Sequence, residues 1–421
     1  AENVAIGYLA LTNNTTGTHN VAVGSSDGSS GATLGTNSTG SQNTALGMQA
    51  LGSNTTADNN TGVGYQSLKA NTTGTRNTAI GSFALDANTT ADNNTAVGTH
   101  SMTDNTTGAE NSAFGQSSLT NNTTASGNTA IGHQVLFTNT TGANNTAIGK
   151  NALVVNTTGA SNVAVGALVL DANITGASNV AIGISALTND TKGNKSIAIG
   201  DNALSSQNFT SATDSLNVAV GHRAGVAVTT GIQNTFVGGL AGDAMASGAN
   251  NTFIGYNVDS DSNSGGSRIG LGAGLSCTAN NQTKIGVGSN FVTNTFTSNA
   301  TWAHSSDSRL KENVADDVLG LSFINALKPV TYNWKKQADV PEEIRGTHEK
   351  DTDAKMHGML AQDIKAALDT EGVDTFLGWS EDTNGTQMIS ESMFIYPLIK
   401  AIQEQNALIE ALTARITTLE G

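Results

Sequence analysis

The sequence predicts an all-β repeat solenoid, a parallel β-roll or β-helix with 17-residue rungs, followed by a mainly α-helical domain that ends in a coiled coil. Three observations predict this fold class. A 17-residue unit recurs from the first residues to about Gly255, the composition changes from Ser306 onward, and the final residues follow a heptad pattern. Self-similarity at a fixed period is typical of a stacked solenoid, in which one repeat cannot bury its apolar side chains alone.

The strongest element of the repeat is Asn-x-Ala-apolar-Gly, as at 77–81 and 145–149. Its closing glycines recur every 17 residues at positions 47, 64, 81, 98, 115, 132, 149, 166, 183 and 200. Further copies close at Gly7, Gly24, Gly221, Gly238 and Gly255, with a six-residue excess before Gly47 and a four-residue excess after Gly200.

Seventeen residues allow two short strands and two turns in each rung. Residues 78–80, Thr-Ala-Ile, alternate small and branched side chains and predict the first strand. We expect the second strand around Ala84 and Leu85. The recurring Asn-Thr-Thr, as at 88–90, is typical of a turn, and stacked asparagines would form side-chain ladders.

The first strand carries apolar side chains on both faces, so a thin coil leaves one row of them outside. Ala79 points into the coil and Ile80 outward, or the reverse. Neighbouring rungs are expected to lie about 4.8 Å apart, so about fifteen repeats would form a rod about 70 Å long. An apolar stripe along such a rod marks a self-association surface, and a closed homotrimer would bury it.

Composition limits the partners. The net charge is −15 without a basic patch, which argues against nucleic acid as a partner and against anionic membranes. No apolar run approaches the ~20 residues of a membrane span, and no signal peptide is visible. The single cysteine, Cys277, excludes an intrachain disulfide, and we expect a buried, inert thiol. The sequence begins within a repeat and without Met, so we expect a fragment or a processed product that lacks an attachment region.

The repeats offer few other sites. Asn-Thr-Thr is also a glycosylation acceptor pattern, although a repeated turn ladder is the favoured interpretation. An ice-binding face would rather repeat Thr-x-Thr, because neighbouring residues of an extended segment point opposite ways. Glycan hydrolysis needs paired carboxylates, whereas single aspartates at turns are expected to be solvated, namely Asp86, Asp104 and Asp171. The histidines of the repeats occupy differing rung positions and are interpreted as surface residues, not metal ligands: His19, His100, His133 and His222.

The pattern decays after Gly255, where 268–270 and 284–286 are degenerate rungs. We therefore expect a solenoid shaft over residues 1–286 and a β-rich connector over 287–305. Residues 306–421 form a third region, with helices expected at 318–326 and from about 358 onward. Residues 395–420 follow a coiled-coil heptad, with isoleucine at its a positions (395, 402, 409, 416) and leucine or Gln405 at its d positions (398, 405, 412, 419). Ile at a with Leu at d by itself favours a dimer, which conflicts with the expected trimer.

The pentapeptides at 162–166 and 179–183 resemble the head repeats of trimeric autotransporter adhesins of the YadA type, whose repeats are shorter. The C-terminal region closely resembles the self-cleaving endosialidase-type chaperone of phage tail spikes and fibres. The shared elements are Ser-Asp-x-x-x-Lys-Glu-Asn-Val from 306, Leu-Lys-Pro-Val-x-Tyr-x-Trp from 327, Gly-x-x-Ala-Gln-Asp from 358, and the terminal heptads.

This resemblance implies a homotrimeric helical cap that templates folding of the β-structure before it and then cleaves itself off with a serine–lysine dyad. Ser306 takes the place of the nucleophile and Lys311 that of the base, and we expect Asp307 and Arg309 to shape the junction. A lysine accepts a proton only when neutral, and burial favours that form. A spacing of five does not place Ser306 and Lys311 on one helix face, so a turn must bring them together.

The expected protein is thus a phage tail-fibre shaft in the virion, outside the cell, that contacts other tail proteins and a host glycan or protein receptor. No metal or cofactor and no turnover enzyme is expected. Two alternatives remain open at this point. One is a bacterial surface adhesin that uses the same chaperone, and the other is a glycan-degrading tail spike.

Overall fold

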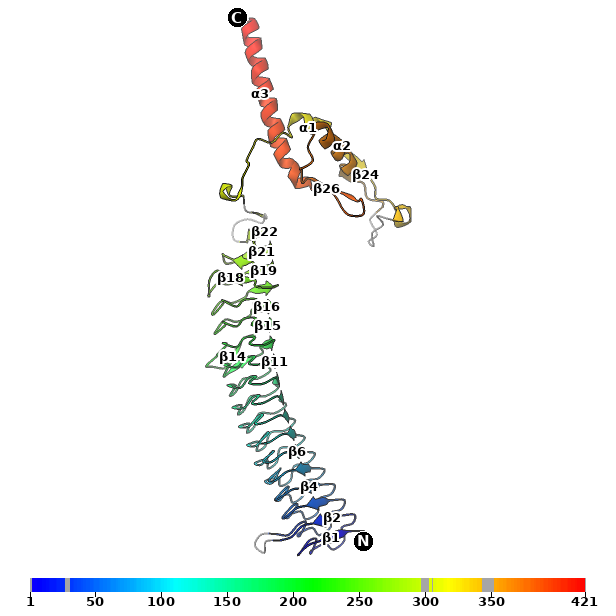
Figure 1. The fold of residues 1–421 in the computed structure, drawn as a ribbon, viewed down its shortest axis with the longest axis vertical. Coiled ribbons are helices and arrows are strands. Elements are labelled where there is room, and N and C mark those ends of the chain that lie inside the picture. The colour runs from blue at the N-terminus through cyan, green and yellow to red at the C-terminus, as the bar shows by residue number, and fades with distance from the viewer. Residues whose placement is uncertain (1, 27–30, 297–302, 305, 343–351, 421) are drawn as a thin grey trace. The chain divides into compact units, whose positions relative to one another are not determined.

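The computed structural model describes residues 2–26, 31–296, 303–304, 306–342 and 352–420. The chain divides into two compact units, Ala1–Ser305 and Ser306–Gly421. The first unit is a parallel β-solenoid, and its rungs follow one another in sequence order from the blue N-terminus (Figure 1). None of the described helices is long and apolar enough to cross a membrane.

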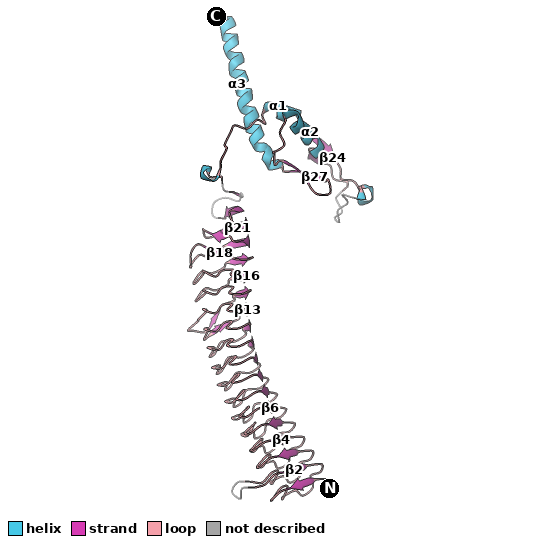
Figure 2. Ribbon diagram, in the orientation of Figure 1, coloured by secondary structure: helices cyan, strands magenta, loops and turns pink. Residues whose placement is uncertain are grey.

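One short strand per rung builds the main sheet, and these strands line one side of the stack while turns form the rest of each coil (Figure 2). The parallel strands are β1 Val4–Ile6, β2 Val21–Val23, β3 Thr44–Leu46, β4 Thr61–Val63, β5 Thr78–Ile80, β6 Thr95–Val97, β7 Ser112–Phe114, β8 Thr129–Ile131, β9 Thr146–Ile148, β10 Val163–Val165, β11 Val180–Ile182, β13 Ile197–Ile199, β15 Val218–Val220, β16 Thr235–Val237, β17 Thr252–Ile254, β19 Ile269–Ala273 and β21 Gln282–Val287. Each pairs in register with its neighbour, as Ala79 with Ala96, so the 17-residue period is the period of the stack.

The two insertions leave the main sheet unbroken. Val21 pairs with Thr44 across the first, and Ile197 pairs with Val218 across the second. Two side pairs lie outside the main sheet, β12 Gly193–Asn194 with β14 Thr213–Asp214 and β18 Asp259–Ser260 with β20 Ser276–Cys277. The degenerate rungs still belong to the stack, because β17, β19 and β21 pair in parallel. The antiparallel strands β22 Asn290–Thr295 and β23 Ala303–His304 then extend the same sheet.

The strand orientation is settled by burial. Ala79 is 0% exposed and Ile80 is 42% exposed, so the small residue faces the core. The outward position is exposed and apolar in many rungs, at Leu46, Ile80, Phe114, Ile131, Ile182, Val237 and Ile254. The predicted apolar stripe is therefore present on the sheet face of the single chain.

The predicted second strand is wrong. Residues 82–87 form consecutive turns, and Phe83 and Leu85 have left-handed backbones with φ of 57° and 54°. The Phe83 N–H donates to Tyr65 O of the preceding rung at 2.9 Å, whereas the Leu85 N–H donates to Ser101 O of the following rung at 2.9 Å. The backbone of this turn thus forms hydrogen bonds to both the preceding and the following rung. The left-handed conformation costs about 1–2 kcal/mol per non-glycine residue, and burial of the leucine offsets it by about 2 kcal/mol.

The interior is partly polar, because two asparagines of each rung between Asn37 and Asn179 are fully buried. Asn88, from Asn-Thr-Thr, donates from Nδ2 to Asn71 Oδ1 at 2.8 Å and to Ala91 O at 3.1 Å. Asn77, from the pentapeptide, donates to the same Ala91 carbonyl at 2.8 Å, and its Oδ1 accepts from the Asn94 N–H at 2.9 Å. Both residues are 0% exposed, so the expected side-chain ladders are present and the glycosylation pattern is inaccessible in the folded rod.

Glycine closes each strand because the next rung lies against it. Gly81 has φ of 139°, and a Cβ there would lie 2.4 Å from Gly98 O. Near the C-terminal end of the unit, Phe236 takes the place of the strand alanine and Gly242 that of the buried leucine. A Cβ on Gly242 would meet the Phe236 ring at 2.6 Å, so the two exchanges conserve core volume.

The second unit is small and mainly helical, with α1 Leu321–Ala326, α2 Ala361–Glu371 and α3 Ile395–Glu420. The predicted first helix begins three residues late, after Gly320. The unit also contains two antiparallel strand pairs, β24 Val330–Tyr332 with β25 Met356–Gly358 and β26 Trp379–Glu381 with β27 Gln387–Ile389. Short 3₁₀ turns lie at Ser308–Leu310, Gln337–Asp339 and Glu391–Phe394. Its core contains Phe323 stacked on Phe394 at 6.2 Å and edge-on to Phe376 at 5.8 Å.

The asparagine ladder predicts a large effect of one interior amide. Asn105→Ala leaves Asn88 Oδ1 without its donor and Asn122 Nδ2 without its ladder acceptor. We expect the free energy of unfolding to fall by about 3 kcal/mol. The control is Thr107, an exposed residue of the same rung, and Thr107→Ala should change the free energy of unfolding by less than about 0.5 kcal/mol. Chemical denaturation followed by circular dichroism measures both, and equal midpoints for the two variants would contradict the ladder's role.

Candidate functional site

A 3₁₀ turn brings the two predicted dyad residues together. Residues Ser308–Leu310 form the turn, and its last N–H, that of Lys311, donates to Ser308 O at 3.2 Å. The reversal lets Lys311 Nζ donate to Ser306 Oγ at 2.7 Å. Two residues five apart thus meet at the very start of the second unit.

Asp307 and Arg309 hold the turn. The Asp307 carboxylate accepts from the Arg309 backbone N–H at 2.9 Å, and it receives the guanidinium at 3.0 Å from Nε and 2.6 Å from Nη2. Such a two-pronged, charge-assisted pair fixes geometry. The Arg309 side chain, and then its backbone N–H, lower the pKa of Asp307 below its usual range. The same contact raises the pKa of the Arg309 guanidinium.

The dyad lies on the surface of the single chain. Ser306 and Lys311 are both exposed, and the apolar side chains of Leu310, Val314 and Val318 in the same stretch of chain are 73%, 79% and 69% exposed. Serine becomes a useful nucleophile only when a base takes its proton, and a lysine does so only when neutral, a form that burial favours. The interpretation of this pair as a dyad therefore predicts that a further surface covers the segment before the serine reacts.

A carboxyl pair on the solenoid could not be predicted from the repeat. Asp243 and Asp259 lie 16 residues apart in sequence, one short of the period, and their carboxyl groups are hydrogen-bonded. Burial, followed by this hydrogen bond, raises the pKa of Asp259 to about 7. Asp259 also accepts from the Ala244 N–H at 2.8 Å, so the pair joins neighbouring rungs.

Asp86 and Asp171 are less solvated than predicted, whereas Asp104 is exposed as predicted. Burial raises the pKa of Asp86 to about 6, with a smaller contribution from Asp104 on the next rung. Asp171 accepts a 2.5 Å hydrogen bond from Thr188 Oγ1. Cys277 is buried as expected, and desolvation raises its thiol pKa.

The histidines are exposed, as predicted, at positions 19, 100, 133 and 222. Among the described residues, no group of three or more His, Cys, Asp or Glu side chains is arranged to hold a metal ion.

The carboxyl pair predicts a pH dependence of stability. The folded pKa of Asp259, about 7, lies above the unfolded value of about 3.9. Its contribution to stability is therefore complete below about pH 4 and is lost as the pH rises through about 7. In Asp243→Asn, the amide can donate to Asp259 and one negative charge disappears, so the pKa of Asp259 should fall toward the value that burial alone sets.

We expect the melting temperature of Asp243→Asn to differ less between pH 5 and pH 8 than that of the unsubstituted chain. Glu110→Gln, which removes an exposed carboxylate from another rung, should leave the difference unchanged. An undiminished pH difference in Asp243→Asn would show that the pair is not coupled.

Comparison with known proteins places the dyad in a recognised region. Residues 306–373 match the family described as chaperone of endosialidase. No curated protein matches the chain. The matched region begins at Ser306 and includes Asp307, Arg309 and Lys311. The match supports an intramolecular chaperone of the endosialidase type behind a β-solenoid, as in a tail-spike-type protein.

Proposed function

We propose that the chain is the distal shaft of a phage tail fibre, a trimeric structural protein that contacts a host receptor. In this proposal the C-terminal unit drives trimerisation and then cleaves itself off next to Ser306. The observation that carries the proposal is the 2.7 Å contact between Lys311 Nζ and Ser306 Oγ, located at the first residue of the endosialidase-chaperone match.

The uncovered surfaces support assembly of several copies. The a and d side chains of α3 are exposed, among them Ile402 at 57%, Ile409 at 53% and Leu412 at 57%. The second half of α3 extends away from α1 and α2 within its unit (Figure 1). The apolar stripe of the solenoid is likewise uncovered. A cyclic arrangement, threefold in this proposal, buries both surfaces with one symmetry, because identical stripes and identical helices then face one axis.

In this proposal, assembly also buries the dyad, which is exposed in the single chain. A neighbouring copy that packs on Leu310, Val314 and Val318 would bury the segment and favour the neutral amine of Lys311. That amine takes the Ser306 Oγ proton, and Oγ attacks the adjacent peptide carbonyl. The peptide bond breaks as an ester forms, the proton passes to the leaving amine, and one water then hydrolyses the ester. Cleavage in this scheme reports correct assembly.

The shaft itself acts by binding. Its partners in this proposal are a host glycan or protein receptor and other tail proteins, and its location is the virion tail outside the cell. A bacterial surface adhesin would carry the same chaperone, and the genes beside the coding sequence separate the two, tail genes against secretion genes. An array of host glycans probed with the assembled protein identifies a carbohydrate receptor.

Substitution of the dyad tests the proposed cleavage. Ser306→Ala, Lys311→Ala and Lys311→Arg should each leave the full-length chain intact, because alanine removes the nucleophile or the base and arginine stays charged. We expect a loss of several orders of magnitude in rate, and the Ser306 and Lys311 losses should not add. Ser308→Ala removes an exposed hydroxyl of the same turn and should cleave normally.

The readout is a denaturing gel after expression, with the junction determined by N-terminal sequencing and the copy number by sedimentation. Normal cleavage of Ser306→Ala would refute the dyad. An intact unsubstituted trimer would mean that the C-terminal unit is a permanent cap.

A further inference from the structure

The segment that carries the dyad joins the core of the helical unit at Leu319. Residues 311–319 form no helix or strand, and the chain then enters α1. Leu319 is 2% exposed in the core of the unit, and its N–H donates to Asp317 Oδ1 at 3.0 Å. The position of Ser306 and Lys311 therefore depends on how this entry to α1 is held.

Glu404 of α3 holds that entry. The first N–H of α1, that of Leu321, donates to Glu404 Oε2 at 2.7 Å, across 83 residues of sequence. Gly320 lies so close that a Cβ there would approach the same oxygen to 2.3 Å. Lys400, one turn earlier on α3, lies 3.9 Å from the other Glu404 oxygen. A helix N-terminus with free N–H groups favours a carboxylate at this point.

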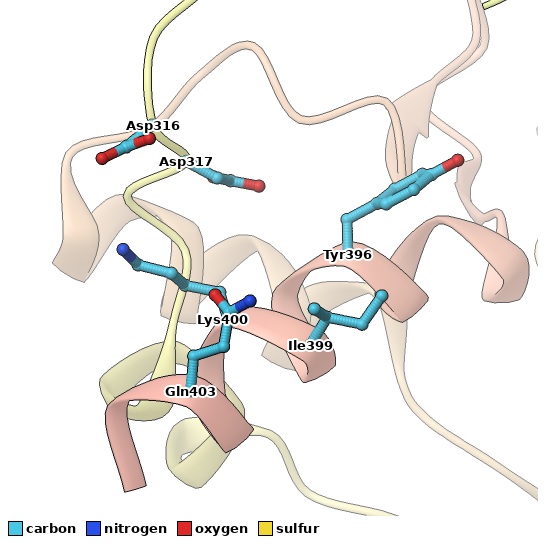
Figure 3. A pocket seen from close by; sticks show the side chains of 6 residues that line it. All are labelled: Asp316, Asp317, Tyr396, Ile399, Lys400 and Gln403. Carbon is cyan, nitrogen blue, oxygen red and sulfur yellow. The ribbon is translucent and has the colours of Figure 1, made fainter. Parts of the chain in front are cut away.

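The acidic residues before α1 lie across the same part of α3. Figure 3 shows Asp316 and Asp317 facing a shallow hollow of about 270 Å³, with Lys400 and Gln403 on its far side. Tyr396 and Ile399 complete its lining. The chain that leads from Lys311 to α1 is thus placed along the helix and not only at its end.

Glu404 does not compete with the coiled coil. It occupies a c position of the heptad, on the side of α3 where Pro397 and Ala401 are buried against its own unit. The a and d side chains face elsewhere and stay exposed. One helix can therefore join its copies through one face and hold the dyad segment through another.

We propose that Glu404 is a positioning residue for the Ser306–Lys311 dyad, linking the dyad segment to the helix that trimerises. This inference rests on the proposed self-cleavage. With Glu404 in place, the dyad is held at a set distance from the threefold axis, where the neighbouring copy covers it. Without Glu404 the segment pivots on Leu319, and small misplacements are costly to a reaction that depends on near-attack geometry.

The test follows cleavage of the full chain made by cell-free synthesis, after translation is stopped. Glu404→Ala should slow cleavage about tenfold, the factor that corresponds to loss of a hydrogen bond to a charged group. Glu404→Gln keeps an oxygen that accepts from the Leu321 N–H and should cleave within about twofold of the unsubstituted chain. Glu410→Ala, on the exposed part of α3, is the matched control.

Assembly is measured in parallel on the non-cleaving Ser306→Ala background. Glu404→Ala should sediment as the same trimer, with a melting temperature within a few degrees of that background, whereas Ile409→Asp should lose both the trimer and cleavage. Cleavage of Glu404→Ala at the control rate would overturn the inference. Slow cleavage accompanied by a lost trimer would also overturn it, because Glu404 would then serve assembly. Cleavage in Ser306→Ala itself would instead refute the proposed function, and the inference with it.

Discussion

The solenoid depends on buried amides that only a neighbouring rung can satisfy. Asn88 needs Asn71 on one side and Asn105 on the other, and a buried amide without a partner costs about 1–3 kcal/mol. One rung therefore has no stable fold, and each added rung satisfies the one before it. The same rule makes the register degenerate, because a slip of one whole rung of 17 residues restores nearly every bond.

Apart from the insertion before Gly47, the main exceptions to uniformity lie in the C-terminal half of the rod. The ladder of the Asn-Thr-Thr asparagines stops at Asn173, whose Oδ1 lacks a partner because Asp190 follows, and Asp190 accepts from Gln207 Nε2 at 2.6 Å. The Phe236 and Gly242 exchange comes later still. Arg268 then takes the place of the pentapeptide asparagine after Asn251, and its guanidinium donates to Cys277 O at 2.5 Å and to Asp261 at 2.8 Å. Unique contacts of this kind fit only one register, and they lie in the part of the solenoid that borders the helical unit in sequence.

The sequence predicted features that repeat or are local. The period, the strand at 78–80, the asparagine ladders and α3 all follow from spacing, and the Ser306–Lys311 contact follows from a motif. The prediction of a second strand was wrong because Ala84 and Leu85 have the small-then-branched pattern of a short strand, whereas Leu85 adopts a positive φ that sequence rarely indicates. The Asp243–Asp259 pair is one residue out of phase with the period. The Glu404–Leu321 bond spans 83 residues and has no local signal at all.

Expression of residues 1–305 alone tests most directly whether the C-terminal unit sets the register of the rod. The full chain should give one trimeric species in sedimentation velocity, whether or not cleavage follows. Residues 1–305 should give aggregates or a mixture of oligomers, because identical rungs offer no unique alignment and long-range registration is slow. A soluble, homogeneous trimer from residues 1–305 would contradict the account.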